Sequence, residues 1–370
     1  MRVLQIIETL NIGGAENFTV QLSNELCASN EVIVVVTRNS NEHYNFISTL
    51  NGKIGLKELK WKKKYSLKQV WHLNKVINDI KPDIIHVHLH NSFYYVFALS
   101  ILHKKWKIVH TVHNSIEVWK IVQDWVNKLR FLSNSITHVC ISKSISADFR
   151  KNYPKLKECQ INNGIKPFIV TRKKEDLHQF WKEICGTIEP EACIKFLAIG
   201  NISRFKNFIL LARALKQIEQ KYPNVKCAIV GRSVNQNLTD EINSLKSQNL
   251  KLMGAFTNAA DFLTGADALI ISSSEEGMPI VALEALSLSK PIISTPAGGM
   301  VDIVSDGYNG FISKDFEIDS YIKTIENYLS LSKSEIEEMQ KNAGETFAKN
   351  YQIEKISKKY FDLYTNVVEN

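Results

Sequence analysis

The chain has 370 residues, of which 44% are hydrophobic and 23% charged, a composition typical of a globular protein in water. Its length exceeds one comfortable core, so we expect two domains. No apolar run is long enough to span a membrane, the first residues read as a strand rather than as a signal peptide, and the six cysteines form no C-x-x-C pair. These features argue against a membrane span and a cysteine metal cage, and they indicate a cytoplasmic protein with reduced cysteines.

Positive charge is concentrated in the first half of the chain. Residues 1–170 contain 23 Lys and Arg against 12 Asp and Glu, a net charge of +11, and residues 171–370 contain 23 against 26, a net charge of −3, which together give the +8 of the whole chain. Seven lysines surround Trp61 and Tyr65: Lys53, Lys57, Lys60, Lys62, Lys63, Lys64 and Lys68. Three more, Lys104, Lys105 and Lys107, flank Trp106. Basic residues interleaved with aromatic ones suit an anionic membrane surface. A solvated lysine-rich loop is the alternative, and no nucleic-acid-binding motif accompanies the lysines.

Short apolar strands alternate with longer amphipathic helices, which predicts an α/β fold with parallel sheets built from βαβ units. In the first half we expect strands at 3–7, 32–37, 84–88, 107–112, 138–142 and 159–162. In the second half we expect strands at 194–199, 226–230, 251–252, 268–271, 291–294 and 310–312. One series in each half predicts two Rossmann-like domains that face each other across a cleft.

The turn signal Asn163-Gly164 ends the first series of strands. The polar stretch 166–191 is expected between the domains, with a helix of its own, and the tail 332–369 is helical by its pattern. We therefore predict domains at 1–165 and 166–350 and a separate final helix at 351–370.

The first half contains two features that could bind a ligand at the ends of strands. Gly13-Gly14 follows the first strand and opens a helix, so the backbone there can approach a ligand closely. The pair is not G-x-G-x-x-G, and a tight turn without a ligand is the alternative. His113 ends the strand 107–112, where ligands of open α/β sheets bind.

Three histidines, His86, His88 and His90, alternate along one predicted strand and would share one face. We interpret His88 as lining the side of the sheet where a ligand binds. A zinc site is disfavoured because no carboxylate or cysteine lies nearby in the sequence. Ser142 also falls at the end of a strand and is expected on the same side.

The second half has cations and glycines at strand ends. Gly200 to Asn207 follows the strand 194–199 and includes Arg204 and Lys206. Gly231-Arg232 follows the strand 226–230. Cations suit a phosphate leaving group, whose charge grows as its bond breaks. No D-x-D pair occurs in the sequence, so we expect these cations and a helix start to neutralise that charge without a metal.

The most informative stretch is Glu276-Gly277-Met278-Pro279-Ile280-Val281-Ala282-Leu283-Glu284, after the apolar strand 268–271. Gly277 and Pro279 are typical of a helix start, whose free N–H groups form an anion site suited to phosphate. Glu276 and Glu284 add acceptors for hydroxyl groups. This combination suits a sugar nucleotide, whereas the alternative is an amphipathic helix with solvated glutamates.

The motif Glu276-x7-Glu284 resembles the signature of family 4 retaining glycosyltransferases, which have the GT-B fold. The resemblance implies that Glu276 lies against the donor sugar and Glu284 binds the ribose hydroxyls. It also implies that backbone amides at Gly277, Met278 and Ile280 meet the diphosphate. The loop 254–256 falls where the family binds the base through its backbone.

Other motifs extend this resemblance over nearly the whole chain. Gly13-Gly14-Ala15-Glu16 is similar to the family loop that meets the donor diphosphate and the acceptor. His113, in Thr-Val-His, resembles the family's histidine near the 6-position of the donor sugar, and Lys206 matches its diphosphate lysine. The family's arginine is replaced by Asn201, and Arg204 is expected to supply the missing charge. Gly231, Arg232 and Ser142 match family loops in residue type, and the resemblance implies that His88 and Ser142 lie on the acceptor side.

The resemblance implies a retaining transferase with an acceptor-binding domain at 1–165, a nucleotide-sugar-binding domain at 166–350 and a last helix that packs back on the first domain. It would move a hexose or N-acetylhexosamine from a nucleoside-diphosphate sugar, with a UDP-sugar favoured, to a hydroxyl of a glycan or lipid-linked oligosaccharide. Glu276, Lys206 and His113 would form the catalytic set, with no cofactor beyond the donor. Such chemistry belongs to surface polysaccharide or lipopolysaccharide assembly, at the inner face of the cytoplasmic membrane.

Three alternatives remain open at this point. A GT-B epimerase of a UDP-sugar shares the fold but needs acid/base carboxylates in the cleft. An NAD-dependent oxidoreductase shares the Rossmann units, although the missing G-x-G-x-x-G argues against it. A catalytically silent GT-B partner subunit is the third alternative, supported only by Asn201.

Overall fold

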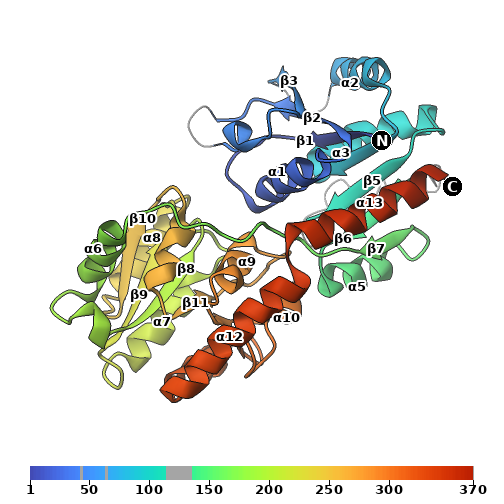
Figure 1. The fold of residues 1–370 in the computed structure, drawn as a ribbon. Coiled ribbons are helices and arrows are strands. Elements are labelled where there is room, and N and C mark those ends of the chain that lie inside the picture. The colour runs from blue at the N-terminus through green and yellow to red at the C-terminus, as the bar shows by residue number, and fades with distance from the viewer. Residues whose placement is uncertain (42–44, 63–65, 114–135, 370) are drawn as a thin grey trace. The chain divides into compact units, whose positions relative to one another are not determined.

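The chain divides into two compact units in the computed structural model, which describes residues 1–41, 45–62, 66–113 and 136–369 (Figure 1). The first unit comprises Met1–Lys166 together with Tyr351–Asn370, and the second comprises Pro167–Asn350. Each unit is built around one parallel sheet. The predicted α/β fold with two parallel-sheet domains is therefore confirmed.

The first unit contains a seven-stranded sheet with the order β3-β2-β1-β4-β5-β6-β7. Its strands are β1 (Arg2–Ile7), β2 (Glu31–Arg38), β3 (Gly55–Trp61), β4 (Ile84–His88), β5 (Ile108–Val112), β6 (Ile136–Cys140) and β7 (Glu158–Gln160). Its helices are α1 (Gly14–Leu26), α2 (Leu67–Ile80), α3 (His90–Leu102), α5 (Lys143–Asn152) and α13 (Ile353–Glu369), with a 3₁₀ turn η1 (Ile47–Thr49). Strand order reverses between β1 and β4, and such a switch point is where open α/β sheets bind ligands.

The second unit contains a six-stranded sheet with the order β10-β9-β8-β11-β12-β13. Its strands are β8 (Ile194–Ile199), β9 (Val225–Val230), β10 (Leu250–Gly254), β11 (Ala268–Ile271), β12 (Ile292–Ser294) and β13 (Gly310–Ile312). Its helices are α6 (Lys174–Cys185), α7 (Phe208–Ile218), α8 (Gln236–Ser244), α9 (Ile280–Ser287), α10 (Met300–Ile303), α11 (Ile318–Leu329) and α12 (Lys333–Asn350), with 3₁₀ segments η4 (Pro190–Ala192) and η5 (Ala259–Gly265). Its switch point lies between β8 and β11.

The cores explain why the strands could be found from sequence. Central strands of a parallel sheet are covered on both faces, so they are apolar throughout rather than alternating. Val34, Val35 and Val36 of β2 are all fully buried. In the second unit, two tyrosines of α11 reach β11: Tyr321 Oη donates to the carbonyl of Ile271 (3.0 Å) and Tyr328 Oη to that of Asp267 (3.1 Å). α11 thereby holds both ends of the strand that leads into the motif 276–284.

The strand β3 was missed by the sequence prediction. Among the described strands it pairs with β2 alone, and an edge strand with lysines such as Lys57 and Lys60 lacks the apolar run of a central strand. Its last residue, Trp61, is buried against Tyr95, with ring centroids 4.9 Å apart. Trp61 is therefore a core residue, and the expectation that it contributes to a membrane surface was wrong.

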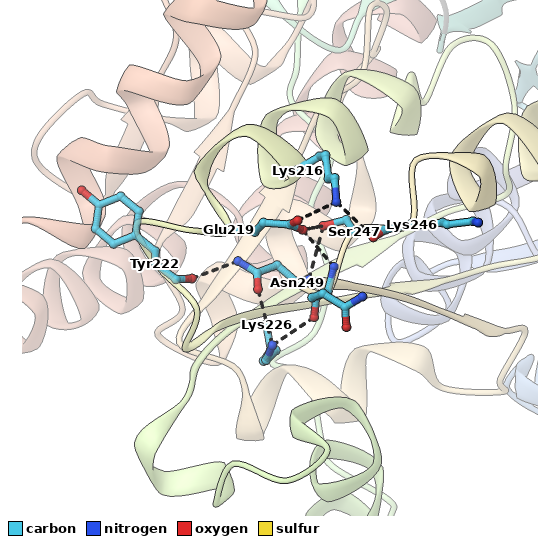
Figure 2. A network of polar contacts seen from close by, with 8 residues as sticks. Lys216, Glu219, Tyr222, Lys226, Lys246, Ser247 and Asn249 are labelled. Carbon is cyan, nitrogen blue, oxygen red and sulfur yellow. Dashed lines mark hydrogen bonds and ion pairs between the residues drawn. The ribbon is translucent and has the colours of Figure 1, made fainter.

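A polar network fixes the amino ends of β9 and β10 (Figure 2). Lys226 Nζ donates to the carbonyl of Gln248 (2.9 Å), and the Asn249 amide donates to the carbonyl of Tyr222 (2.9 Å). Glu219 accepts hydrogen bonds from Lys216, Ser247 and the Gln248 amide. Because buried polar groups cost energy unless they are paired, this network stabilises the turn into β10. The turn lies at the amino ends of the strands, away from their carboxyl ends.

The predicted helical tail is two helices that belong to different units. α12 is part of the second unit, whereas α13 packs on the first beside α1. Backbone bonds join α13 to the end of the first series, from Ile165 to the Tyr351 carbonyl (2.9 Å) and from Ile353 to the Ile165 carbonyl (3.0 Å). The expected return of the last helix to the first domain is confirmed.

Gly164 makes this junction possible, because a Cβ there would lie 2.5 Å from Ile356 Cγ1 and 2.9 Å from the Tyr351 carbonyl oxygen. We predict that Gly164→Ala lowers the free energy of unfolding by about 1–3 kcal/mol, the usual cost of overpacking. Denaturant unfolding of the two variants would test this, with Gly52→Ala as the control, since nothing lies within 4 Å of a Cβ at Gly52. Equal stability of both variants would contradict the role of Gly164.

Candidate functional site

The loops after β8, β9 and β10 lie against one another through their backbones. The Gly200 amide donates to the carbonyl of Val230 (2.9 Å), and the Gly231 amide donates to that of Gly254 (2.8 Å). A Cβ at Gly231 would lie 1.8 Å from the carbonyl oxygen of Gly200, which no side chain allows. The predicted donor residue Gly231 therefore has a clear packing role at this edge.

Lys206 and Glu276 form an ion pair between the loop after β8 and the loop after β11. Lys206 Nζ lies 2.6 Å from Glu276 Oε1, and the two side chains are 24% and 11% exposed. Ser273 Oγ donates to the same carboxylate oxygen at 2.6 Å. The structure thus brings together two of the three predicted catalytic residues. Gly200 leaves room for the lysine, since a Cβ there would lie 2.8 Å from Lys206 Cε.

A glycine pair after β12, which the sequence analysis did not single out, supports the motif. The Gly299 amide donates to the carbonyl of Glu276 (3.2 Å). Cβ atoms at Gly298 and Gly299 would lie 1.8 Å and 2.0 Å from the carbonyl oxygens of Glu276 and Gly277, and Gly298 has φ +48°. The Gly-Gly pair just beyond a strand was the sequence signal that could have revealed this contact.

α9 begins directly after this contact. Pro279 is its N-cap residue and provides no side-chain acceptor for the first turn. The side chains of Met278 and Ile280 are buried, so these two residues can offer a ligand only their backbone. This agrees with the backbone role that the family resemblance assigns to them together with Gly277.

Glu284 lies one helical turn further along α9 with its carboxylate half-buried. Among the described residues it has no hydrogen-bond or ion-pair partner. Burial, with a smaller contribution from the negative charge of Asp261, raises the pKa of Glu284 to about 7. A carboxylate with free acceptor capacity at this depth is suited to bind hydroxyl groups.

The cations near this pair differ in their surroundings. Arg204 is exposed, and its guanidinium makes no hydrogen bond or ion pair within the described part of the chain. Asn201, at the family's arginine position, accepts a hydrogen bond from the Arg232 amide (3.3 Å), and the Ile202 amide donates to the Arg232 carbonyl (2.8 Å). Asn201 therefore links two loops, and Arg204 is the exposed cation beside Lys206.

In the first unit, Gly13 is the N-cap residue of α1, and Gly14 is its first helical residue. A Cβ at Gly13 would lie 2.4 Å from Glu16 Oε2, so the glycine makes room for that carboxylate. Burial and the nearby Glu8 raise the pKa of Glu16, while a hydrogen bond from its own backbone opposes the shift. The start of α1 is thus faced by a carboxylate from its own first turn.

The predicted histidines His88 and His113 are buried and in contact, with His88 Nδ1 3.1 Å from His113 Nε2. Burial lowers the pKa of His88 well below its ordinary value and that of His113 to about 3, so both are neutral. His90 begins α3 rather than continuing β4, because Leu89 between them has φ 63° and ends the strand. The expectation that three histidines share one strand face was wrong for His90.

Ser142 is fully buried and caps α5, where its Oγ accepts a hydrogen bond from the Ile145 amide (3.2 Å). This cap accounts for the serine without a ligand. The predicted set is therefore divided, with Gly13, Gly14, His88, His113 and Ser142 in the first unit and the remaining residues in the second.

Among the described residues, no group of three or more His, Cys, Asp or Glu side chains is arranged to hold a metal ion. In the same part of the chain, every helix is too short or too polar to cross a bilayer.

Two protein-family models together match most of the sequence. The model described as Glycosyltransferase Family 4 matches residues 12–167, and the model described as Glycosyl transferases group 1 matches residues 182–347. The chain belongs to the family 4 glycosyltransferases. It is an enzyme that transfers a sugar from a nucleotide sugar.

This glycosyltransferase is similar to two curated bacterial enzymes. It is 26% identical over 336 residues, 82% of each chain, to N,N'-diacetylbacillosaminyl-diphospho-undecaprenol alpha-1,3-N-acetylgalactosaminyltransferase of Campylobacter jejuni. It is 26% identical over 327 residues, 82% of this chain and 80% of the relative, to UDP-Gal:alpha-D-GlcNAc-diphosphoundecaprenol alpha-1,3-galactosyltransferase of Escherichia coli. The crystal structure of Anabaena Alr3699/HepE in complex with UDP-glucose has the same fold, with a TM-score of 0.82 and 16% identity over 99% of this chain and 100% of that one.

The raised pKa of Glu284 makes the stability of the glycosyltransferase depend on pH. Its folded pKa of about 7 exceeds the ordinary 4.5, so the folded state binds the proton more tightly, and stability falls as pH rises from about 4.5 to about 7. We predict that Glu284→Gln is more stable than the wild type at pH 8, by roughly 1–3 kcal/mol since each pKa unit is worth about 1.4 kcal/mol and partial exposure reduces the effect.

Denaturant unfolding at pH 5 and pH 8 would measure this difference. At pH 5 the two proteins should be nearly equal, because Glu284 is protonated in the folded state. Glu241→Gln is the control, since Glu241 is an exposed partner of Arg213. If Glu284→Gln were no more stable than the wild type at pH 8, desolvation of this carboxylate would not be the cause.

Proposed function

We propose that this glycosyltransferase moves a hexose or N-acetylhexosamine from a UDP-sugar to a hydroxyl of a lipid-linked glycan, with retention of configuration, in bacterial surface polysaccharide assembly. The observation that carries the proposal is the Lys206–Glu276 pair beside a half-buried Glu284 without a partner among the described residues. A cation, a helix start and a free carboxylate are the three groups that a nucleoside-diphosphate sugar needs. The named donor of the Escherichia coli relative and the UDP-glucose bound by the Anabaena protein support UDP.

The chemistry follows from where charge develops. As the glycosidic bond breaks, negative charge grows on the diphosphate, and Lys206, Arg204 and the backbone amides at the start of α9 would stabilise it. Glu276 holds Lys206 at 2.6 Å and would orient the sugar, while Glu284 would accept from the ribose hydroxyls. The family mechanism needs no enzyme nucleophile. The acceptor hydroxyl attacks the sugar from the same face from which the leaving group departs, and the departing phosphate oxygen takes the proton of that hydroxyl. The protein contributes orientation and charge stabilisation.

The second unit would bind the donor and the first would bind the acceptor. Both named relatives act on diphospho-undecaprenol-linked sugars, which supports a lipid-linked acceptor. An enzyme of this kind would work in the cytoplasm, at the inner face of the membrane that carries the acceptor.

The donor assignment can be tested by calorimetric titration with UDP, GDP and NAD and by steady-state transfer assays. Lys206→Ala should lower kcat by about 10²- to 10³-fold, the usual cost of removing a group that stabilises developing negative charge. Lys221→Ala is the matched control, because Lys221 also pairs with a glutamate, Glu326, at 2.7 Å but lies on an exposed surface.

Glu284→Gln should weaken UDP binding roughly 10- to 100-fold, the value of hydrogen bonds to a charged group. Unchanged UDP affinity would contradict the ribose role of Glu284. Binding of NAD alone would overturn the transferase donor site, and UDP binding without transfer to any lipid-linked acceptor would favour a silent partner subunit.

A basic, partly apolar face of α2 is the best candidate for contact with the membrane. Leu67 and Trp71 are 80% and 63% exposed and lie four residues apart, on one side of the helix. Lys68 and Lys75 are exposed on the same helix. In the predicted region Lys53–Lys68, the lysines Lys53, Lys57 and Lys60, in or near β3, are also exposed. Lys63, Lys64 and Tyr65 lie outside the described residues. We propose an anionic lipid surface as the partner of this face, since tryptophan and lysine together suit the interface.

Vesicles of anionic phospholipid would test this partner. The double variant Leu67→Ser with Trp71→Ser should bind at least about tenfold more weakly, because two large apolar side chains contribute about 1.5–3 kcal/mol each when buried. Phe316→Ser is the control, since Phe316 is an exposed aromatic residue of the second unit. Absence of vesicle binding by the wild type would rule out this surface.

A further inference from the structure

A buried polar network lies between the first sheet and α13, the red helix at the carboxyl end of the chain in Figure 1. It contains two tyrosines of α13, two histidines of β4, one histidine just after β5, and one residue each from β1 and β5. Its members are Gln5, His86, His88, Thr111, His113, Tyr360 and Tyr364, all of them buried. Neither of the tyrosines is used by the proposed chemistry.

The tyrosine side of the network begins at Tyr364. Tyr364 Oη lies 2.6 Å from His86 Nδ1 and accepts a hydrogen bond from Gln5 Nε2 at 3.5 Å. Because this oxygen accepts from Gln5, its own proton is directed to His86. His86 Nε2 then donates to Thr111 Oγ1 (2.7 Å), whose hydroxyl lies 3.1 Å from Tyr360 Oη.

The orientation of the Gln5 amide sets the protons on the histidine side of the network. Gln5 Oε1 can only accept, so His88 Nε2, at 2.8 Å, carries a proton. Burial lowers the pKa of His88 well below its ordinary value, so the ring is neutral and its Nδ1 accepts from His113 Nε2 at 3.1 Å. His113 is neutral for the same reason. Its Nδ1 is therefore a bare acceptor, with no hydrogen-bond partner among the described residues.

We propose that Tyr364 is a positioning residue that sets the tautomer of His113 through Gln5 and His88. By accepting from the amide nitrogen of Gln5, Tyr364 directs the amide oxygen to His88. A rotated Gln5 amide would instead donate to His88 Nε2, which would reverse every later donor and acceptor and place a proton on His113 Nδ1. With the Gln5 amide nitrogen on the Tyr364 hydroxyl, as in this structure, His113 Nδ1 is an acceptor.

The tautomer determines what His113 can recognise. A bare Nδ1 binds a group that donates a hydrogen bond, such as a sugar hydroxyl, and repels the lone pairs of a carboxylate. This inference rests on the proposed transfer function and on the family resemblance, which implies that His113 lies near the 6-position of the donor sugar. The inference adds that the site selects a sugar with a neutral hydroxymethyl group over a uronic acid. Tyr364 of α13 would cause this selection by setting the tautomer of His113.

The tautomer can be measured in the free protein by ¹⁵N NMR of the histidine rings, without any substrate. In the wild type we expect protonated Nε2 and bare Nδ1 on His113. In Tyr364→Phe, loss of the oxygen frees Gln5 to rotate, so a second tautomer of His113 should appear. Tyr360→Phe is the matched control, because it removes a buried hydroxyl of the same helix whose hydrogen bond, among the described residues, is to Thr111, and it should keep the wild-type pattern.

An Nδ1-protonated His113 in the wild type would overturn the inference even if the variants failed to fold. An unchanged tautomer in folded Tyr364→Phe would overturn it as well, since a merely structural tyrosine would lower stability and leave the ring protons in place. Titration with UDP-glucose and UDP-glucuronate adds a functional readout: Tyr364→Phe should reduce the preference for UDP-glucose several-fold, and Tyr360→Phe should not. If the wild-type tautomer were as expected but neither ligand bound, the proposed function would fail and the positioning role would stand.

Discussion

The donor side of this glycosyltransferase depends on backbone segments that touch without side chains between them. Gly231 packs on the carbonyl of Gly200, and Gly298 packs on the carbonyl of Glu276. A Cβ atom at either glycine would lie 1.8 Å from that carbonyl oxygen, which is too close. These contacts hold the loops after β8 and β9 together, and likewise the loops after β11 and β12. Lys206 and Glu276 meet at 2.6 Å because the loops that carry them have little freedom to separate. Preorganised charges of this kind stabilise a developing charge without reorganisation.

The two glutamates of the signature have different environments, and these fit different tasks. Glu276 is already bound by a lysine and a serine, so it is held in one orientation. Glu284 has no such partner among the described residues, and burial raises its pKa to about 7. The protein therefore keeps a poorly solvated carboxylate that lowers stability near neutral pH, which is the usual price of a site that must bind hydroxyl groups.

The first unit uses burial in the opposite way. His86, His88 and His113 are neutral because they are desolvated, and their protons are arranged by neighbours rather than by pH. Two tyrosines of α13 complete this arrangement. The last helix thus does more than cover the sheet, since it also closes a polar network that the first unit cannot satisfy with residues 1–166 alone.

Much of the fold could be read from local pattern. Central strands such as β4, β8 and β11 are predicted to the residue, because buried parallel strands are continuous apolar runs bounded by polar segments. The edge strand β3 was missed because it pairs on one side and is open to solvent on the other, so its residues do not form a continuous apolar run. The motif 276–284 predicted the family, because the residues expected to bind one ligand lie within a short stretch of chain at a fixed spacing.

What the sequence by itself determined is therefore the α/β class, the two sheets and the family, because each depends on residues close together in the chain. The tertiary structure alone decided which groups are paired. It placed Asn201 as a link between loops, Trp61 in the core and His90 on a helix. It also placed Tyr364 of α13 beside His86, 278 residues earlier. Hydrogen bonds and desolvation act over a few ångströms in space, so no local pattern encodes them.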